Sequence, residues 1–435
     1  MLRLNTKDAG FETRFKRLID ERRESDDDVS RDVRDIIAEV RQTGDEALAE
    51  YTMRFDKHAL TADLTSWRVD AAQCRAAYEF LDPDLRAALD LAAERIRAYH
   101  VEQLPQDRDF TDDAGVRLGA KWRPVDAAGL YVPGGRAAYP SSLLMNAIPA
   151  KVAGVGRLVV VTPTPQGTLN ELVLAAAYLA GVDEVWRVGG AQAIAALAYG
   201  TKRIRPVDVI TGPGNAWVAE AKRQLYGVVG IDMVAGPSEI LVISDNKSDP
   251  EWLAADLLSQ AEHDPSAQSI LITDDDGFGF AVEDAVDLLS VQLSTERVAR
   301  ASWDKYGTII TVQDLAAEAP ELANRLAAEH VELCVDDPEA MFAKIRHAGS
   351  VFMGRHTPEA VGDYVAGPNH VLPTGRRARF ASGLSVLDFM KRTSFLAVDA
   401  PALGEIGPAA VAMANAEGLP AHAKSVEIRL KGTTK

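Results

Sequence analysis

The stretch Glu184-Val-Trp-Arg-Val-Gly-Gly-Ala-Gln-Ala193 decides the fold class of this chain. Its first five residues form an apolar run typical of a short buried strand, and two glycines then end that run. The alanine-rich segment 191–199 predicts a helix and places Gln192 in its first turn. A strand that turns directly into a helix is the building unit of a parallel α/β sheet.

The same alternation of strand and helix continues on both sides of this stretch. Short apolar runs predict strands at 158–162, 184–188, 207–211 and 239–243, and a second set at 269–273, 308–312, 331–335 and 351–353. Helices are expected between the first strands, at 169–180, 191–199 and 216–226. This spacing predicts an α/β fold with two Rossmann-like, doubly wound domains and parallel sheets. The segments before about residue 105 and after about Ser382 look mostly helical.

Composition indicates a globular protein and limits its partners. The chain has 435 residues, 47% of them hydrophobic and 26% charged, which is enough for two or three domains with buried cores. A formal net charge of −17 argues against binding to the phosphate backbone of nucleic acids. Two cysteines are too few for a disulfide scaffold, and we find neither a signal-peptide core nor a membrane-spanning run. We therefore expect a cytoplasmic protein that binds neither nucleic acids nor membranes.

Three glycine-rich loops lie at the expected carboxyl ends of strands, where parallel sheets bind ligands. Gly-Gly precedes Gln192, and Thr211-Gly-Pro-Gly-Asn215 places Asn215 at a helix start. Such turns offer backbone N–H groups and a positive helix end to a phosphate. Neither matches the pattern G-x-G-x-x-G, and an ordinary capped turn explains each of them as well. In the third loop, 131–142, Tyr131 would pack on a ligand ring or cover the loop itself.

The stretch Asp256-Leu-Leu-Ser-Gln-Ala-Glu-His-Asp264 closes a helix that is expected to begin near Pro250. Asp256, Gln260 and His263 recur at i, i+4 and i+7 and share one polar face. Glutamine and histidine on one face could hold a divalent metal through oxygen and nitrogen. A solvated polar stripe would show the same spacing.

Glu329-His330 directly precedes the predicted strand 331–335. A carboxylate beside an imidazole at a strand edge can act as an acid/base pair, although a surface glutamate next to a core histidine gives the same pattern. Cys334 lies inside this strand run. We therefore interpret it as a buried, inert thiol rather than as a nucleophile that attacks an aldehyde.

Two later segments add metal-ligand residue types. Asp363 lies in a glycine-flanked loop, and Glu417 ends a helix before Gly418, with His422 in an extended segment beyond it. A catalytic zinc site uses such a set of histidine, aspartate and neutral oxygen ligands. The compact spacing H-E-x-x-H is absent from the sequence.

Several long motifs lie between about Leu130 and His422: Tyr131-Val-Pro-Gly-Gly, Tyr139-Pro-Ser-Ser-Leu-Leu-Met-Asn-Ala-Ile-Pro-Ala, Gly189-Gly-Ala-Gln-Ala-Ile-Ala, Gly212-Pro-Gly-Asn, Ile231-Asp-Met-Val-Ala-Gly-Pro-Ser-Glu, Ser259-Gln-Ala-Glu-His-Asp and Glu417-Gly-Leu-Pro-Ala-His. Together they closely resemble the histidinol dehydrogenase family, which performs the last two oxidations of histidine biosynthesis. Trp217 is a departure, because the family more often has tyrosine there. This exchange leaves the implied mechanism intact.

The resemblance implies roles for individual residues. It implies one Zn²⁺ per subunit, with the ligands Gln260, His263, Asp363 and His422. The acid/base pair falls on Glu329 and His330, and the NAD⁺ contacts fall on Tyr131, Gln192 and Asn215. The implied contacts to L-histidinol are Ser238, Gln260, His263, His330, Asp363, Glu417 and His422.

The resemblance also implies a homodimer with shared active sites, in which Glu417 and His422 complete the site of the neighbouring subunit. The implied reaction is a four-electron oxidation of L-histidinol to L-histidine through L-histidinal, with two NAD⁺ as acceptors. His330 would take the alcohol proton, and Glu329 would activate the water that attacks the aldehyde.

Together with the element pattern, the resemblance predicts a domain map. It comprises an N-terminal helical arm (1–25), a discontinuous α/β domain with zinc and the acid/base pair (26–129 and 239–381), an NAD-binding domain (130–238) and a C-terminal dimerisation tail (382–435). Two other functions stay open. One is a relative that oxidises another small polar primary alcohol, against which Glu417 and His422 argue. The other is a non-catalytic nucleotide-binding scaffold, which would be expected to lack a ligand or the Glu-His pair.

Overall fold

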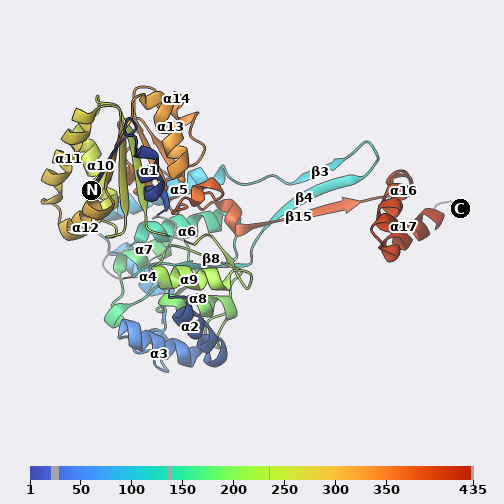
Figure 1. The fold of residues 1–435 in the computed structure, drawn as a ribbon. Helices are drawn as coiled ribbons and strands as arrows, with labels where there is room; N and C mark the ends of the chain where they lie inside the picture. The colour runs from blue at the N-terminus through green and yellow to red at the C-terminus, as the bar shows by residue number, and fades with distance from the viewer. Residues whose placement is uncertain (21–28, 135–138, 235, 433–435) are drawn as a thin grey trace. The chain divides into compact units, whose positions relative to one another are not determined.

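The computed structural model describes residues 1–20, 29–134, 139–234 and 236–432 (Figure 1). The chain divides into two compact units. The first comprises residues 1–103 and 126–389 and contains two six-stranded sheets. The second comprises residues 104–125 and 390–435. Across the described ranges, no helix is both long and apolar enough to cross a membrane.

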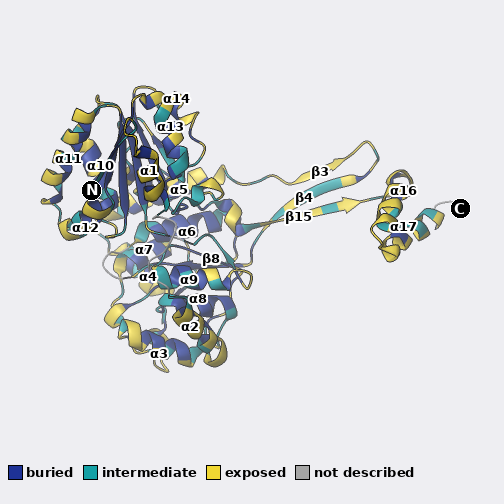
Figure 2. Ribbon diagram, viewed as in Figure 1, coloured by how far each residue is buried: buried dark blue, intermediate teal, exposed yellow. Residues whose placement is uncertain are grey.

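The first sheet is entirely parallel. Its strands lie in the order β1 (Leu2–Asn5), β12 (Thr308–Thr311), β11 (Gln268–Thr273), β10 (Glu239–Ser244), β13 (His330–Cys334) and β14 (Ser350–Met353). One face shares a core with α1 (Phe11–Asp20), α13 (Leu315–Leu326) and α14 (Pro338–Phe342). The other face shares a core with α10 (Pro250–Ala261), α11 (Asp276–Ser290) and α12 (Glu296–Tyr306). Figure 2 shows its strands buried between these helices, so the predicted doubly wound arrangement is confirmed for this sheet.

The second sheet has the order β2 (Arg68–Val69), β7 (Glu184–Trp186), β6 (Arg157–Val161), β5 (Ala127–Tyr131), β8 (Val209–Thr211) and β9 (Gly230–Ile231). Only the pairing of β2 with β7 is antiparallel among these described strands. One core cluster joins it to α2 (Ser30–Thr43), α3 (Asp45–Asp56), α8 (Gly190–Tyr199) and α9 (Ala216–Leu225). The remaining helices of this half are α4 (Ala71–Glu79), α5 (Pro83–Val101), α6 (Pro140–Ala153) and α7 (Glu171–Leu179).

Helix starts follow the capping residues of the sequence. The side chain of Asp249 accepts a hydrogen bond from the backbone of Glu251, ahead of Pro250 in the first turn of α10. Asn215 caps α9 by accepting from the backbone N–H groups of Trp217 and Val218. These caps satisfy N–H groups that have no partner within the helix. The strands and helices predicted by residue range between 158 and 353 lie within about two residues of the observed ones, except that the helix expected to close at Asp256–Asp264 already ends at Ala261.

The second unit is a three-stranded antiparallel sheet followed by two helices. Its strands lie in the order β15 (Met390–Ala397), β4 (Arg117–Pro124) and β3 (Arg108–Thr111). The helices α16 (Ala400–Ala416) and α17 (Pro420–Gly432) pack against each other. The helical tail predicted after about Ser382 is therefore wrong at β15, whereas α16 and α17 are helical as expected. Most of that strand is exposed, so it lacks the apolar run that marks buried strands.

The N-terminus also differs from the prediction. Residues 1–25 were expected to form a helical arm, but β1 is an edge strand whose residues Leu2–Asn5 pair with Thr308–Thr311. Phe11 and Phe15 of α1 are buried in the core of the first sheet. Four strand residues at an edge give too little periodicity to reveal the pairing in the sequence. Residues 21–25 of the expected arm lie outside the described residues.

The structure groups segment 26–129 differently from the predicted domain map. Its strand β2 pairs with β7, and its helices α2 and α3 share a core with α8 and α9. Most of this segment thus belongs with 130–238, while residues 104–125 join the second unit. The apolar faces of α2 and α3 pack against the alanine-rich helix α8. Helical spacing in the sequence reveals such a face but not the element against which it packs.

The N-terminal segment is expected to be integral to the first sheet. Phe15→Ala should lower the free energy of unfolding by about 3–5 kcal/mol, because it empties a fully buried ring position in that core. Phe80→Ala removes a ring that is 88% exposed and should change the free energy by less than about 0.5 kcal/mol. Urea unfolding followed by circular dichroism measures both. A neutral Phe15→Ala would mean that the segment is a dispensable arm.

Candidate active site

The acid/base candidates lie at the amino end of β13. Glu329 precedes the strand and His330 is its first residue, and both are buried. The Glu329 carboxylate accepts hydrogen bonds from the backbone N–H of Glu239, at 3.0 Å, and from the Ser238 side chain. Burial raises the pKa of the Glu329 carboxyl well above its usual range, and the hydrogen bond from Glu239 opposes that shift only partly. The Glu-His pair is thus a desolvated site and not a surface carboxylate.

The ring of His330 has two different nitrogen environments. Nδ1 lies 3.1 Å from the carbonyl oxygen of Glu239, 3.1 Å from Oε1 of Gln260 and 3.1 Å from Oε1 of Glu359. Nε2 is buried without a hydrogen-bond partner. Burial lowers the pKa of His330 to about 3, so the ring is neutral at neutral pH. Since acceptors surround Nδ1, the proton belongs there, and Nε2 keeps a free lone pair.

Glu359 was missed by the sequence analysis. It begins α15 (Glu359–Tyr364) and is only 2% exposed. Its Oε1 lies 3.1 Å from Nδ1 of His330 without the geometry of a hydrogen bond, and its Oε2 has no partner. Burial raises its pKa well above the usual range, and the Asp363 carboxylate adds to the shift. A signal was available, because Glu359 and Asp363 stand four residues apart and share a helical face.

Asp256 is connected to this cluster through Glu332. Its side chain shares a hydrogen bond with Glu332, which in turn accepts a hydrogen bond from the backbone N–H of Glu359 at 2.6 Å. Burial raises the pKa of Asp256 to about 6 and that of Glu332 well above its usual range. Two carboxyl groups this close share a proton more readily than they carry two charges. Asp256 thus supports the site through Glu332.

Asp363 lies in α15, and not in a loop as expected from its flanking glycines. Burial raises its pKa to about 6, against the opposing effect of His263, which is exposed just beyond the end of α10. His370 donates from Nδ1 to the carbonyl oxygen of Asp363 at 3.0 Å, and its Nε2 lies 3.3 Å from Oγ of Ser142. The loop after α15 is therefore tied to α6 of the second sheet.

Two of the predicted metal ligands of the first unit lie close to His330. Gln260 is fully buried and its Oε1 lies 3.1 Å from Nδ1 of His330, and Asp363 offers a ligand atom within 4.8 Å of one of His330. His263 is exposed beyond the end of α10 and is not part of that cluster, although its charge opposes the raised pKa of Asp363. The Nε2 atom of Gln260 is buried without a hydrogen-bond partner. These nitrogen and oxygen donors suit Zn²⁺.

A second set of potential ligands overlaps with the first. Within the described residues, His330, Glu359 and Asp363 offer ligand atoms that all lie within 4.8 Å of one another. The cluster is thus compatible with a divalent cation, and Asp363 is common to both sets. His422 and Glu417 belong to the second unit, where both are exposed. His422 lies in the first turn of α17, not in the extended segment that was expected.

The three predicted dinucleotide contacts lie at the carboxyl edge of the second sheet. Tyr131 ends β5, and its buried hydroxyl accepts a hydrogen bond from the backbone N–H of Gly190 at 3.1 Å. The side chain of Gln192 folds over Gly190, and its Oε1 is buried without a partner. Asn215 is exposed at the start of α9 after β8. The strand order reverses between β5 and β8, which is where parallel sheets bind nucleotides. Residues 135–138 of the Tyr131 loop lie outside the described residues.

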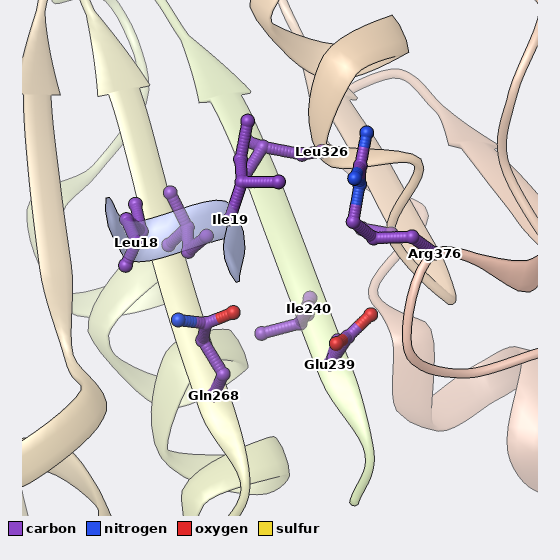
Figure 3. A pocket seen from close by; sticks show the side chains of 9 residues that line it. Leu18, Ile19, Glu239, Ile240, Gln268, Leu326 and Arg376 are labelled. Carbon is purple, nitrogen blue, oxygen red and sulfur yellow. The ribbon is translucent and has the colours of Figure 1, made fainter. Parts of the chain in front are cut away.

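A shallow pocket lies beside the acid/base pair. It is lined by Glu239, Gln268 and Arg376, together with apolar residues of α1, β10, β11 and α13 (Figure 3). Glu239 connects this pocket with the acid/base pair. Its backbone forms hydrogen bonds with Glu329 and His330, and the residue also lines the pocket. None of the predicted site residues lines the pocket.

One parallel and one mostly parallel sheet with helices, a buried Glu-His pair and a nucleotide-type edge are typical of a nucleotide-dependent α/β enzyme. The model of the histidinol dehydrogenase family matches residues 19–430, so the chain belongs to this family. Histidinol dehydrogenase of Zymomonas mobilis is 62% identical over 99% of both chains. That of Ruegeria pomeroyi is 60% identical over 98% of both. The crystal structure of histidinol dehydrogenase from Elizabethkingia anophelis matches with a TM-score of 0.93 and 35% identity, covering 100% of this chain and 99% of that one.

The buried pair Asp256–Glu332 is expected to lower stability as the pH rises. The raised pKa of Glu332 means that the unfolded chain ionises first above about pH 4.5, so the folded state loses about 1.4 kcal/mol per unit of pKa difference. Glu332→Gln should therefore raise the midpoint of thermal unfolding more at pH 8 than at pH 5. The exposed variant Glu339→Gln serves as control. An equal shift at both pH values would show that ionisation of Glu332 plays no part.

Proposed function

We propose that this chain oxidises L-histidinol to L-histidine through L-histidinal, as the final steps of histidine biosynthesis. One L-histidinol, two NAD⁺ and one water give one L-histidine, two NADH and three protons. The observation that carries this proposal is the buried His330 ring, whose Nδ1 faces acceptors and lies 3.8 Å from Oε2 of Glu329, while its Nε2 has no hydrogen-bond partner. The proposal is also supported by the membership of the chain in the histidinol dehydrogenase family.

His330 is the base for the alcohol. Its Nε2 accepts the hydroxyl proton, while the acceptors around Nδ1 stabilise the imidazolium that forms. Glu329 serves the second oxidation. Once ionised, a carboxylate with a raised pKa is a stronger base, and it can take a proton from the water that attacks the aldehyde carbon. Burial of both residues keeps the reactive aldehyde away from bulk water.

We assign Gln260, His263 and Asp363, together with His422 of a neighbouring subunit, as the residues that hold one Zn²⁺ per subunit. Support comes from the contact of Gln260 with Nδ1 of His330 and from Asp363, which offers a ligand atom within 4.8 Å of one of His330. Bound zinc supplies a Lewis acid that fixes polar groups of the substrate. Ser238 and Glu417 are the further substrate contacts in this proposal.

The dinucleotide is assigned to the carboxyl edge of the second sheet. Tyr131, Gln192 and Asn215 line this edge, and the N–H groups at the starts of α8 and α9 suit its phosphates. His370 contacts both the carbonyl oxygen of Asp363, in α15, and the side chain of Ser142, in α6. Helix α6 follows the loop that begins at Tyr131. This connection brings the substrate residues and the dinucleotide loops into one packed unit.

The homodimer with shared sites is part of the proposal. Glu417 and His422 lie in the second unit and are exposed, as groups that enter another subunit's site need to be. A biosynthetic oxidation agrees with the cytoplasmic location that the sequence predicts. No specific observation favours the oxidation of another small primary alcohol. A non-catalytic scaffold is not favoured either, because every residue of the implied set is present.

The proposed roles predict different losses in the two oxidations. Wild-type protein should form two NADH per L-histidinol. Glu329→Gln should slow the oxidation of L-histidinal by about 10²–10⁴-fold and affect the first hydride transfer less, because only the second step needs activated water. Rapid-mixing measurement of NADH on each substrate separates the steps, with the exposed variant Glu321→Gln as control. Equal rates for Glu329→Gln and wild type on L-histidinal would refute the role, and no turnover of L-histidinol by wild type would refute the function.

Shared sites predict complementation between inactive subunits. A mixed dimer of His422→Ala and Glu329→Gln chains has one intact site, so random exchange should restore about a quarter of wild-type activity. The measurement is NADH formation after the two variants are mixed and subunit exchange is verified by mass spectrometry. Activity that stays at the level of the separate variants, despite exchange, would show that His422 acts within its own subunit.

A further inference from the structure

A buried ion pair lies under the glycine-rich loop that carries Asn215. The side chains of Lys222, on α9, and Asp232, just after β9, are 2% and 1% exposed and form a salt bridge. Placing two charges away from water is unfavourable unless both are fully hydrogen-bonded. Replacement by apolar residues would often be at least as stable, so the polar contacts of the pair deserve an explanation other than stability.

Those contacts hold both backbone groups of one residue. Oδ2 of Asp232 accepts from the backbone N–H of Gly212 at 2.8 Å, and Nζ of Lys222 donates to the carbonyl oxygen of Gly212 at 2.9 Å. Oδ1 of Asp232 also accepts from the backbone N–H of Met233 at 2.6 Å. Gly212 is the first residue of the loop that leads from β8 to Asn215. The ion pair is thus a clamp on the base of this loop.

The clamped residue, Gly212, has a backbone conformation that residues other than glycine rarely adopt. Gly212 has φ +111°, and a side chain there would place Cβ 2.2 Å from the carbonyl oxygen of Tyr131. The loop therefore passes directly over the end of β5. Tyr131 in turn fixes Gly190, next to Gln192, through its hydroxyl. Tyr131 thus contacts both the Gly190 turn, where Gln192 packs, and Gly212, the first residue of the loop that ends at Asn215.

We propose that Lys222 and Asp232 are positioning residues for the dinucleotide, and that they hold the loop 212–215 in its binding conformation before NAD⁺ arrives. A loop that is already ordered loses less entropy when it binds a ligand, which increases affinity. The inference rests on the proposed function, because it needs NAD⁺ to bind at the carboxyl edge of the second sheet. It adds two residues that do not themselves touch the ligand.

The test compares Lys222→Met and Asp232→Asn with wild type. The KM for NAD⁺ and the Kd for NADH, measured by fluorescence titration, should rise about tenfold or more, in line with loss of a hydrogen bond to a charged group. The kcat at saturating NAD⁺, the KM for L-histidinol and the zinc content should stay within about twofold, as expected when only binding of the dinucleotide is weakened. Lys247→Met, which removes an exposed ion pair with Asp336, is the matched control.

The outcomes separate the inference from the proposed function. If wild type neither binds NADH nor reduces NAD⁺ with L-histidinol, the proposed function is wrong. The positioning role is then wrong as well, because no dinucleotide binds at the loop 212–215. If wild type is active but folded variants keep the KM for NAD⁺ within twofold, the positioning role alone is overturned. A parallel rise of both KM values would likewise overturn it, since that indicates general damage to the fold.

Hydrogen exchange of the wild-type protein tests the inference even if the variants do not fold. The backbone N–H groups of Gly212 and Met233 should be protected without NAD⁺ and show little further protection when it is added. Fast exchange of the Gly212 amide until NAD⁺ binds would mean that the loop is ordered by the ligand. That result would overturn the preformed clamp.

Discussion

The parallel pairing of β10 with β13 is the contact on which the candidate site depends. Ile240 pairs with His330, and this register brings Glu239 beside Glu329. The backbone of Glu239 then donates to Glu329 and accepts from His330. A register shift by one residue would turn His330 to the opposite face of the sheet. The acid/base pair is therefore positioned by strand backbone, which is more rigid than a loop.

The two sheets present their functional residues at opposite ends of their strands. In the second sheet, Tyr131, Gln192 and Asn215 follow the carboxyl ends, as parallel sheets usually arrange ligand sites. In the first sheet, Glu329 and His330 lie at the amino end of β13, where α10 returns and delivers Gln260. Because α10 runs back along the sheet, its last turn has to lie at this end.

Much of this architecture could be predicted from the sequence, and the failures have physical reasons. Buried strands and glycine turns are visible because their residue types are constrained locally. The helical face expected for Asp256, Gln260 and His263 is wrong at His263, because α10 ends at Ala261 and leaves His263 exposed beyond it, whereas Gln260 is buried. The short pairings of β1 and β2 could not be predicted, because two to four residues show no period. The strand β15 is stabilised mainly by pairing with β4, and its exposed side chains give no apolar signal. Glu359 shares a helical face with Asp363, but this spacing does not show that the fold leaves Glu359 only 2% exposed.

The distribution of hydrogen bonds distinguishes two kinds of buried polar group in this chain. Lys222 and Asp232 have partners for their charges, and the partners are backbone atoms of a loop, which is how a protein fixes a conformation. Around His330 the opposite holds, since Gln260 and His330 each bury a nitrogen without a hydrogen-bond partner, and Glu359 buries two oxygens without one. Each unsatisfied group costs about 1–3 kcal/mol, so a core selected for stability alone would have paired or replaced them. Their concentration at one strand end is therefore a physical reason to place the chemistry there, independent of any resemblance to other proteins.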